Sequence, residues 1–437
     1  MSPCLRLVFA SLICINLIVA PLKSTDEYDP LIAEILSEGS QYRWAKWIAA
    51  LSGAEPISTD SGEAVIRTRS SYVMFEPNQS PSAFQYVQDE LQALGLEEGE
   101  DFIIHTYAFP YGERYPERNW KNLILTFPGE DPTLQDERVL LVAHLDSTSG
   151  QEGELAPGAD DNASGAAGLL EAAARLRHYN FERTIHLVWF SGEEQNRYGS
   201  KYFVRDYEDW LPEIAGVINM DMFAFDWDND RCFEVHTGTL PGSQQIGQDM
   251  ADMIELYDLD LRFDLIDDET AYTLADQYPF WQAGVPAVMV FENFFYQEGK
   301  TCGNVDRNTQ YHTVADRLPY INQDTGYAIL QAAIATLVHL AGPIQACFAT
   351  PLQAFSYSEF EIVTLNWNAL ENASYYQAWI NEGAGWQLLG ETGNLRWEHT
   401  ATKAQQEADY LVIAVSDTGC QSEPAITHPR KIYAHFE

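Results

Sequence analysis

The fold can be inferred outward from one stretch, Val139-Leu140-Leu141-Val142-Ala143-His144-Leu145-Asp146, in which five apolar residues run directly into polar side chains. A short continuous apolar run is typical of a strand that is buried on both faces of a sheet. Open α/β sheets place their sites at the carboxyl ends of such strands. The stretch therefore predicts a buried strand with a site at its end.

Similar apolar stretches alternate with helical patterns along most of the chain. The further expected strands are residues 102–109, 123–127, 185–190, 216–220 and 287–291. Helical spacing of apolar residues occurs at residues 84–94, 165–176 and 325–340. This alternation predicts an α/β fold in which helices cover both faces of the sheet.

The pattern changes after Pro343. Residues 362–367, 376–380 and 410–415 are short alternating segments separated by turn residues. This pattern predicts a small all-β sandwich over residues 347–437. With Trp367 early and Tyr410 late, the stretch resembles a fibronectin type III domain, and we expect it to contact a surface or a polymer.

The N-terminus predicts export. Residues 1–22 contain a short apolar run that precedes a polar, acidic stretch, which is typical of a signal peptide. An uncleaved anchor is the alternative. We expect a secreted protein, extracellular or periplasmic, without stable membrane insertion after signal removal. Residues 23–71 are interpreted as a lead-in segment or a propeptide, and residues 72–343 as the catalytic domain.

Four cysteines remain after the signal: Cys232, Cys302, Cys347 and Cys420. An even number in an exported chain is compatible with two disulfides, and sequence permits three pairings. Cys347–Cys420 is favoured because both residues lie in the C-terminal segment. Cys232–Cys302 then follows by elimination and is the weaker expectation.

The net charge excludes several classes of partner. The chain has 25 Lys and Arg against 65 Asp and Glu, a formal charge of −40. Nucleic acid is excluded as a partner because a phosphate-binding surface needs clustered basic residues. Adhesion to an anionic membrane is disfavoured for the same reason.

Five places with chemically capable side chains follow the expected strands or lie on adjoining loops. They are His144-Leu145-Asp146, the acidic pair in Gly158-Ala159-Asp160-Asp161-Asn162, Glu193-Glu194, Met220-Asp221-Met222 and Tyr311-His312-Thr313. Each alone has an ordinary structural explanation, such as a helix N-cap for Asp161. Together they would form an uncompensated acidic pocket, which a pair of divalent metal ions would neutralise.

These motifs, in this order, resemble the secreted co-catalytic di-zinc aminopeptidases of the bacterial leucyl-aminopeptidase type, over roughly residues 80–342. The resemblance implies a zinc-exopeptidase-like, mixed and mainly parallel sheet. It also implies two Zn²⁺ ions, for which Co²⁺ or Mn²⁺ could substitute. By position, His144 and Asp221 would bind one ion, Glu194 and His312 the other, and Asp161 both.

The resemblance also assigns catalytic roles. Asp146 would orient His144, and Glu193 would be the general base that activates a metal-bridging water. Tyr272 falls where relatives have a tyrosine that hydrogen-bonds the developing oxyanion; a pocket-wall aromatic is the alternative. The implied reaction is removal of N-terminal residues from peptides or proteins. The aromatic loop Phe294-Phe295-Tyr296 favours large apolar residues.

Two departures from the family pattern leave questions for the structure. Gln277 stands where many relatives have histidine, and Thr270 and Leu274 stand where secreted relatives carry a short disulfide, so that loop must be held otherwise. Three alternative functions remain at this point: a carboxypeptidase with Arg197 or Arg307 as the carboxylate-binding cation, a glutaminyl cyclase, and a non-catalytic receptor-like ectodomain. The intact Glu193-Glu194 pair argues against the last of these.

Overall fold

The computed structural model divides the chain into two compact units, Met1–Ile344 and Gln345–Glu437. It describes residues 28–59, 61–76, 81–108, 119–295, 301–302, 305–344, 352–383, 385–416, 421–422 and 424–431. The expected signal peptide at residues 1–22 lies outside these ranges, so its assignment stays a prediction.

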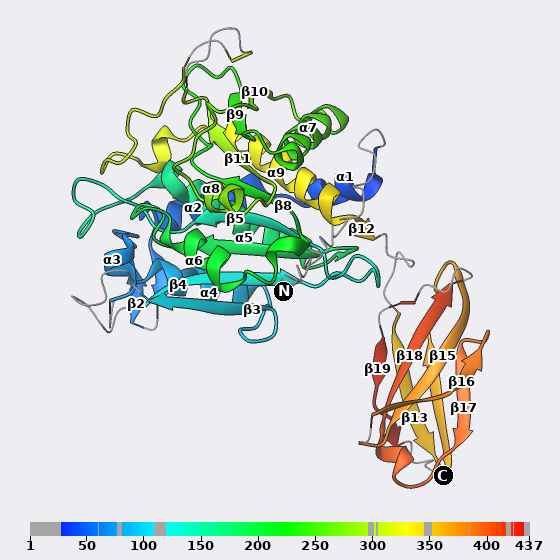
Figure 1. Cartoon of the computed structure of the whole chain (residues 1–437). Coiled ribbons are helices and arrows are strands. Elements are labelled where there is room, and N and C mark those ends of the chain that lie inside the picture. Colours follow the sequence, from blue (N-terminus) through cyan, green and yellow to red (C-terminus); the bar gives the residue numbers. More distant parts are fainter. Residues whose placement is uncertain are drawn as a thin grey trace, which may run out of the picture. The chain divides into compact units, whose positions relative to one another are not determined.

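The first unit contains an eight-stranded sheet (Figure 1). Its order is β10 (Arg262–Ile266), β9 (Cys232–His236), β11 (Ala287–Glu292), β8 (Ile214–Met220), β5 (Arg138–His144), β7 (Thr184–Phe190), β4 (Asn119–Phe127) and β3 (Phe102–Ala108). The neighbours β10–β9, β11–β8, β8–β5 and β5–β7 are parallel, and the other three pairs are antiparallel. The expectation of a mixed, mainly parallel sheet is confirmed.

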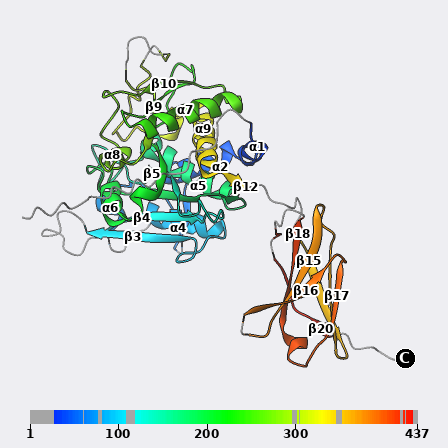
Figure 2. The ribbon, with the colours of Figure 1, turned by 45° about the vertical axis from the view of Figure 1, so that its right-hand side comes forward.

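Helices cover both faces of this sheet, as the apolar strand β5 requires. Alternate residues of β5 belong to two different cores. One core, which contains Val139 and Leu141, packs against α5 (Gly165–Leu176), α7 (Pro241–Leu256) and α9 (Gln323–Ala341). The other, which contains Leu140 and Val142, packs against α6 (Tyr198–Asp206) and α8 (Gln277–Gln282). Figure 2 shows the same layers from a second side.

The lead-in segment is part of the larger core. Its helix α1 (Pro30–Ser37) packs against α9, and its helix α2 (Gln41–Leu51) packs against both α5 and α9. The next helix, α4 (Ala83–Ala93), also packs against α5. Trp44 of α2 is fully buried, and its Nε1 donates to the Ser164 carbonyl at 3.0 Å. Arg43 pairs with buried Glu171 of α5 at 2.7 Å. These contacts tie the segment to the loop that carries Asp161.

The remaining described elements of the first unit are short. They are the strands β1 (Ile57–Thr59), β2 (Gly62–Ala64), β6 (Asn180–Phe181) and β12 (Pro343–Ile344), the helix α3 (Ser71–Met74), and the short helical turns Ala159–Ser164, Leu211–Glu213 and Leu318–Tyr320. Strands β1 and β2 form one antiparallel pair, and β6 and β12 form another.

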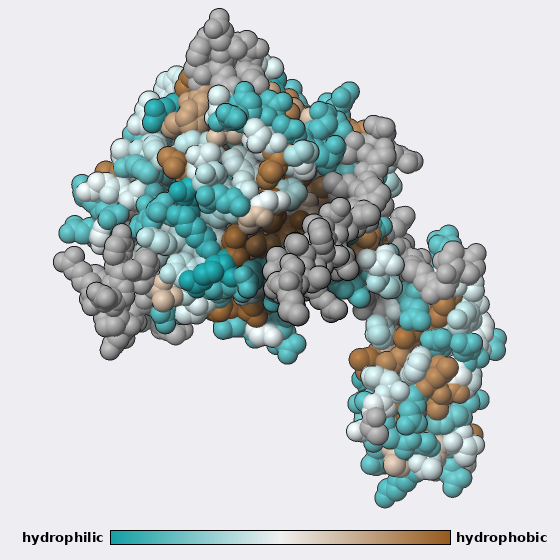
Figure 3. Space-filling view, viewed as in Figure 1, coloured by the Kyte–Doolittle hydropathy of each residue, from teal (hydrophilic) through white to brown (hydrophobic). Residues whose placement is uncertain are grey.

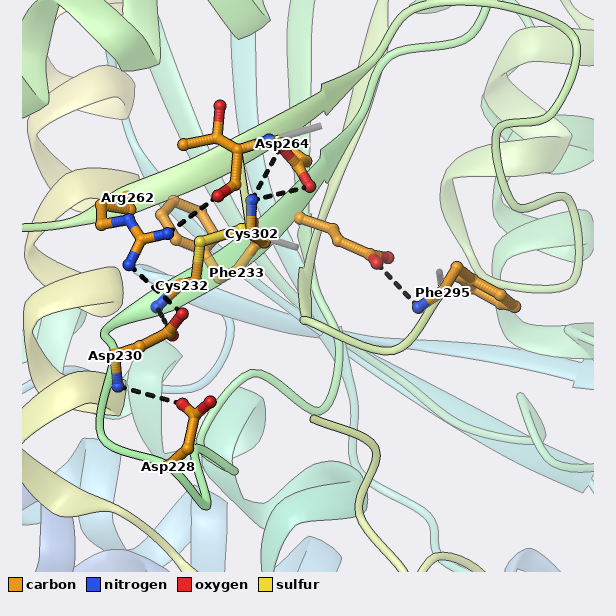
Figure 4. Close-up of a disulfide and its surroundings, with 10 residues drawn as sticks. Asp228, Asp230, Cys232, Phe233, Arg262, Asp264, Phe295 and Cys302 are labelled. Atoms are coloured by element: carbon orange, nitrogen blue, oxygen red, sulfur yellow. Dashed lines mark hydrogen bonds and ion pairs between the residues drawn. A yellow bond between two sulfur atoms is a disulfide. The ribbon is translucent and has the colours of Figure 1, made fainter. Parts of the chain in front are cut away.

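A disulfide joins Cys232 at the start of β9 to Cys302 (Figure 4). The weaker of the two expected pairings is thereby confirmed. Asp264 of β10 accepts hydrogen bonds from the Cys302 backbone N–H at 3.2 and 3.3 Å, so the bridged segment is also fixed to the edge strand. The pairing of Cys347 with Cys420 falls outside the described residues.

The second unit is a small all-β structure, as expected. One sheet has the order β17 (Arg396–Thr400), β14 (Ile362–Trp367), β13 (Ala354–Glu359) and β20 (Arg430–Lys431). The other has the order β16 (Trp386–Thr392), β15 (Ala373–Asn381), β18 (Asp409–Ser416) and β19 (Ala425–Thr427). Buried residues of both sheets, such as Val363 and Val412, share one core. The two sheets therefore form a sandwich, while the fibronectin type III assignment stays a prediction.

Hydrophilic residues predominate on the face drawn in Figure 3, and apolar residues occur there in separate patches. Among the described residues, no helix combines the length and the apolar character that crossing a membrane would require.

Candidate metal centre

The five expected ligands come from the carboxyl ends of three neighbouring strands and from two loops. His144 is the last residue of β5, Glu194 follows β7, and Asp221 follows β8. Since β5 is parallel to both β7 and β8, these three ends meet at one edge of the sheet. Asp161 lies in the turn that joins β5 to α5, and His312 lies on the loop before α9.

The structure brings the five side chains together as two triads that share Asp161. His144, Asp161 and Asp221 form one triad, and Asp161, Glu194 and His312 form the other, with the candidate ligand atoms of each within 4.8 Å of one another. His144 Nε2 lies 3.2 Å from Asp161 Oδ1 and 3.2 Å from Asp221 Oδ1. His312 Nε2 lies 3.1 Å from Asp161 Oδ2 and 3.0 Å from Glu194 Oε2.

Asp161 thus presents a different oxygen to each triad. This is the arrangement that a carboxylate bridging two metal ions requires. The ligand roles themselves stay a prediction, because the positions of side chains do not show a bound ion.

The centre is buried except at one ligand. The side chains of His144, Glu194, Asp161 and Asp221 are 1%, 2%, 6% and 7% exposed, whereas that of His312 is 39% exposed. His312 therefore marks the open side of the site.

Asp146 connects the first triad to the Glu193-Glu194 turn. Its Oδ1 accepts from the Glu193 N–H at 3.2 Å, and its Oδ2 is 3.4 Å from the Glu194 N. The His144 Nδ1 donates to the Asp146 carbonyl at 3.0 Å, while Asp146 Oδ1 lies 3.6 Å away. The ring is oriented through this backbone carbonyl, so its Nε2 faces the two carboxylates of the first triad.

The electrostatics show that the centre lacks positive charge. Burial, followed by the charge of Asp161, raises the pKa of Glu194 to about 7. Burial lowers the pKa of His312, but hydrogen bonds to Asp161 and Glu194 outweigh it and bring that pKa to about 10. In the absence of another cation, protons would have to neutralise the carboxylates, as metal ions otherwise could.

The donor set fits zinc. Each triad supplies one imidazole nitrogen and two carboxylate oxygens, ligands that Zn²⁺ accepts, and three protein ligands are the usual number at a catalytic zinc site. Glu194 Oε1 is buried and has no hydrogen-bond partner, which is costly for a carboxylate unless a cation is close.

Glu193 lies beside the ligands on the same turn as Glu194. Burial raises its pKa well above the usual value, and the charges of Asp276, Asp221 and Glu194 add to this against the opposing effect of His144. The Glu193 carboxyl therefore lies within electrostatic range of His144 and Asp221 of the first triad.

Tyr272 is near the centre and belongs to an aromatic wall. Burial, followed by the charges of Asp221 and Glu193, raises its pKa to about 12. Its ring stacks on Phe291 with 5.9 Å between the centroids, and Phe295 lies beside it at 5.3 Å. The structure is consistent with both expected roles, oxyanion donor and wall.

Hydrogen bonds hold the Tyr272 loop, for which the sequence resemblance implies a support other than a disulfide. The Tyr272 N–H donates to His236 Nδ1 at 3.0 Å, and Gln277 Nε2 donates to the Tyr272 carbonyl at 2.7 Å. Arg197 Nη1 donates to the Thr273 carbonyl. Gln277, the departure from the family pattern, therefore supports this loop directly.

Two residues that no sequence motif indicated, Asn308 and Asp316, hold the Asp161 turn from outside. Asp316 Oδ1 and Oδ2 accept from the N–H groups of Asp160 and Asp161, each at 3.0 Å. Asn308 Nδ2 donates to Asp160 Oδ2 at 3.0 Å. The only local signal was the proximity of Asp316 to His312 in the sequence.

The sequence profile of peptidase family M28 matches residues 122–337, which contain all five candidate ligands. A probable leucine aminopeptidase of Trichophyton verrucosum is 28% identical over 211 residues, which are 46% of this chain and 52% of the relative. The chain spans about half the length of the first curated relatives that it matches.

Two solved structures share the fold. The LapA aminopeptidase of Legionella pneumophila has a TM-score of 0.56 at 17% identity, with 79% of this chain and 81% of that chain covered. A glutaminyl cyclase of Fimbriiglobus ruber has a TM-score of 0.50 at 17% identity, with 69% and 95% covered. At these identities the similarity establishes the α/β fold and leaves the reaction to be argued from the site.

Proposed function

Because residues 122–337 match the profile of peptidase family M28, we propose that the protein is a zinc aminopeptidase that removes N-terminal residues from peptides or proteins. The observation that carries this proposal is the sharing of Asp161 between two His–carboxylate triads. A single-metal site would not need a carboxylate placed between two histidines.

The ligands are proposed as the sequence resemblance implies. His144 and Asp221 would hold one zinc ion, Glu194 and His312 would hold the other, and Asp161 would contribute to both sites. When bound, the two ions would lower the pKa of a water and polarise the scissile carbonyl. Co²⁺ and Mn²⁺ are expected substitutes because they accept the same ligands.

Glu193 is proposed to move the proton. One of its carboxylate oxygens accepts a proton from the attacking water and later delivers it to the leaving amine. Burial favours the protonated form of Glu193, which supports holding that proton between the two steps. Asp146 keeps Glu193 in place through the N–H groups of the turn.

The aromatic wall supports a preference for large apolar N-terminal residues. Buried Met222 and Phe291 pack with Tyr272, Phe294 and Tyr311 in one apolar cluster. Met222 directly follows ligand Asp221, and the ring of Tyr311 lies 3.7 Å from that of ligand His312. An apolar side chain of a substrate would therefore meet this cluster beside the reacting bond.

The carboxypeptidase alternative is disfavoured by the contacts of its candidate cations. Arg197 is 8% exposed, donates to Thr273 and Asn196, and lies over the Tyr278 ring. Arg307 lies over the Phe294 ring at 4.1 Å. Both guanidinium groups are engaged with residues of the protein itself. These contacts argue against either of them binding the carboxylate of a substrate.

The glutaminyl cyclase alternative shares the fold with the Fimbriiglobus ruber enzyme. The family resemblance implies that such cyclases use a single zinc ion and lose some ligands. The presence of both triads therefore supports the aminopeptidase over the cyclase.

The remaining proposals concern location. The Cys232–Cys302 disulfide supports an oxidising compartment and hence export. Residues 347–437 are proposed to form a fibronectin type III-like unit that attaches the enzyme to a surface or a polymer and takes no part in the chemistry.

The direct test is hydrolysis of leucine anilide by the full chain before chelation, after chelation and after zinc is restored. We expect activity to disappear with the metal and to return with zinc. A glutaminyl peptide is the parallel substrate, because a cyclase would form pyroglutamate from it without releasing an amino acid. Absence of anilide hydrolysis by protein with two bound zinc ions would contradict the proposal.

A further inference from the structure

Residues 67–71, here called the lead-in clamp, form a short segment upstream of the residues that match the M28 profile. It contains Arg69, whose side chain is fully buried. A buried guanidinium is costly unless its donors are satisfied and its charge is offset. The partners of Arg69 therefore indicate what the clamp is for.

Arg69 binds the backbone of two loops that carry candidate ligands. Its Nε donates to the Leu145 carbonyl at 2.8 Å, and Leu145 stands between His144 and Asp146. Its Nη2 donates to the Gly158 carbonyl at 2.8 Å, and its Nη1 donates to the Pro157 carbonyl.

Gly158 lies three residues before Asp161, and its φ of 48° places it in the left-handed region, at the start of the turn. The Gly158 carbonyl also accepts from the Ala163 N–H at 3.0 Å within the same turn. Arg69 therefore binds the backbone at the start of the turn that carries Asp161.

Ser71 extends the clamp to a third loop. Its Oγ accepts from the Gly192 N–H at 2.9 Å, and Gly192 directly precedes Glu193 and Glu194. Arg69 and Ser71 thus contact the β5 end, the Asp161 turn and the Glu193-Glu194 turn from one side.

The start of the clamp is itself anchored. The Ala156 N–H donates to the Arg67 carbonyl at 3.0 Å, and Thr68 Oγ1 donates to the Glu152 carbonyl at 2.6 Å. Arg69 Nη1 donates also to the Leu51 carbonyl at the end of α2, at 3.0 Å. The three loops are therefore tied to the helical lead-in segment.

The charge of Arg69 suits its place. Burial lowers its pKa to about 10, while the charges of Asp316, Asp161, Asp146 and Glu194 oppose that shift. The guanidinium stays protonated at neutral pH and adds one fixed positive charge beside a centre crowded with carboxylates.

We propose that Arg69 is a positioning residue for the metal centre and that the lead-in clamp sets the spacing of the three ligand-bearing loops. The proposal rests on the proposed metal centre. It also requires that residues 67–71 remain in the mature enzyme. At least from residue 67 onward, it therefore favours the interpretation of residues 23–71 as a lead-in segment over that of a removable propeptide.

Arg175 provides a matched control. It is equally buried, but its donors go to Glu171, Gln331 and Tyr327 and to no ligand-bearing loop. Loss of either guanidinium should lower the thermal stability of the full chain. Only loss of Arg69 should alter metal binding.

The test compares wild type, Arg69→Met, Arg69→Lys and Arg175→Met by zinc affinity in chelator competition and by the absorption spectrum of the Co²⁺-substituted protein. Residues that orient metal ligands typically change affinity by 10- to 100-fold, so Arg69→Met should bind zinc roughly 10- to 100-fold more weakly and show an altered Co²⁺ spectrum. Arg69→Lys should recover part of the affinity. In the Arg69 variants kcat should fall by a larger factor than KM rises, because the contacts with the substrate remain.

Ser71→Ala is the second variant and is used if Arg69→Met does not fold. It removes one hydroxyl of the lead-in clamp and keeps the buried charge of Arg69. It should alter the Co²⁺ spectrum and lower kcat. A wild-type affinity and spectrum in Arg69→Met, or in Ser71→Ala where the former does not fold, would overturn the proposal. Equal weakening in Arg175→Met would overturn it too. Failure of the wild type to bind two metal ions would instead refute the proposed function.

Discussion

Asp161 is the residue on which the centre depends. Its two oxygens lie 3.2 Å from His144 Nε2 and 3.1 Å from His312 Nε2. The backbone N–H groups of Asp160 and Asp161 donate to the Asp316 carboxylate, and these two hydrogen bonds hold the backbone of the turn. A carboxylate fixed from both ends can bridge two ions without having to be ordered when they bind, which lowers the entropic cost of binding.

For Tyr272, the role of oxyanion donor can be separated from the role of an aromatic in the pocket wall. Tyr272→Phe keeps the ring that stacks on Phe291 and removes only the hydroxyl. If that hydroxyl stabilises the oxyanion, kcat should fall roughly 100-fold while KM stays nearly constant. Steady-state kinetics on leucine anilide measure both parameters.

Tyr278→Phe is the control, because Tyr278 is engaged with Arg197 rather than with the centre. An unchanged kcat in Tyr272→Phe would leave the residue as a wall aromatic and would contradict its proposed role.

The sequence was sufficient for residues whose chemistry is coded locally. His144, Asp161, Glu194 and Asp221 each follow an apolar run or start a helix, so their convergence follows from the order of the parallel strands. Arg69 was not predictable in this way. Its partners Leu145 and Gly158 lie 76 and 89 residues away, and no local pattern marks the contacts.

Among the elements of the fold, the strands that were predicted are those in which apolar residues predominate. Strand β9 was not among them, because Glu234 and His236 interrupt its pattern. Both side chains are buried in the structure, where His236 Nε2 and Glu234 Oε2 lie 2.8 Å apart. The paired partners make the strand compatible with a buried position, and single-residue hydropathy cannot show that pairing.

Strand β7 carries a histidine that should make stability depend on pH. His186 is 3% exposed, stacks on Trp210 and shares a hydrogen bond with Thr126, and burial followed by the charge of Arg138 lowers its pKa to about 3. Below the unfolded value of 6.5, the unfolded state binds a proton that the folded state does not. Stability from this group is therefore lost as pH falls from about 6.5 towards 3.

Between pH 7 and pH 5 the loss from His186 should be about 2 kcal/mol. Urea unfolding of the wild type and of His186→Phe at both pH values measures this, since phenylalanine keeps a ring against Trp210. The variant should lose less stability than the wild type over that interval. Equal losses in the two proteins would show that His186 is not held neutral.

At the scale of the whole molecule, the charge of −40 is a property of the surface more than of the site. The proposed metal centre would use five of the 65 acidic residues, namely Asp146, Asp161, Glu193, Glu194 and Asp221. The remaining excess favours solubility and repulsion between chains.

The division into two units predicts that the chemistry belongs to the first. Each unit has its own hydrophobic core, so each should fold alone. A chain that ends at Ile344 should keep the full-length kcat/KM on leucine anilide, because every proposed ligand precedes that residue. A large loss of turnover in the folded truncated chain would show that residues 347–437 contribute to catalysis.

Five residues are proposed to hold two zinc ions, while Glu193 acts as base and not as ligand. The most direct measurement is zinc content and leucine anilide turnover of Glu193→Gln beside the wild type. We expect two zinc ions in both proteins and a loss of turnover of at least roughly 100-fold in the variant. Loss of a zinc ion from the variant, or turnover close to that of the wild type, would contradict it.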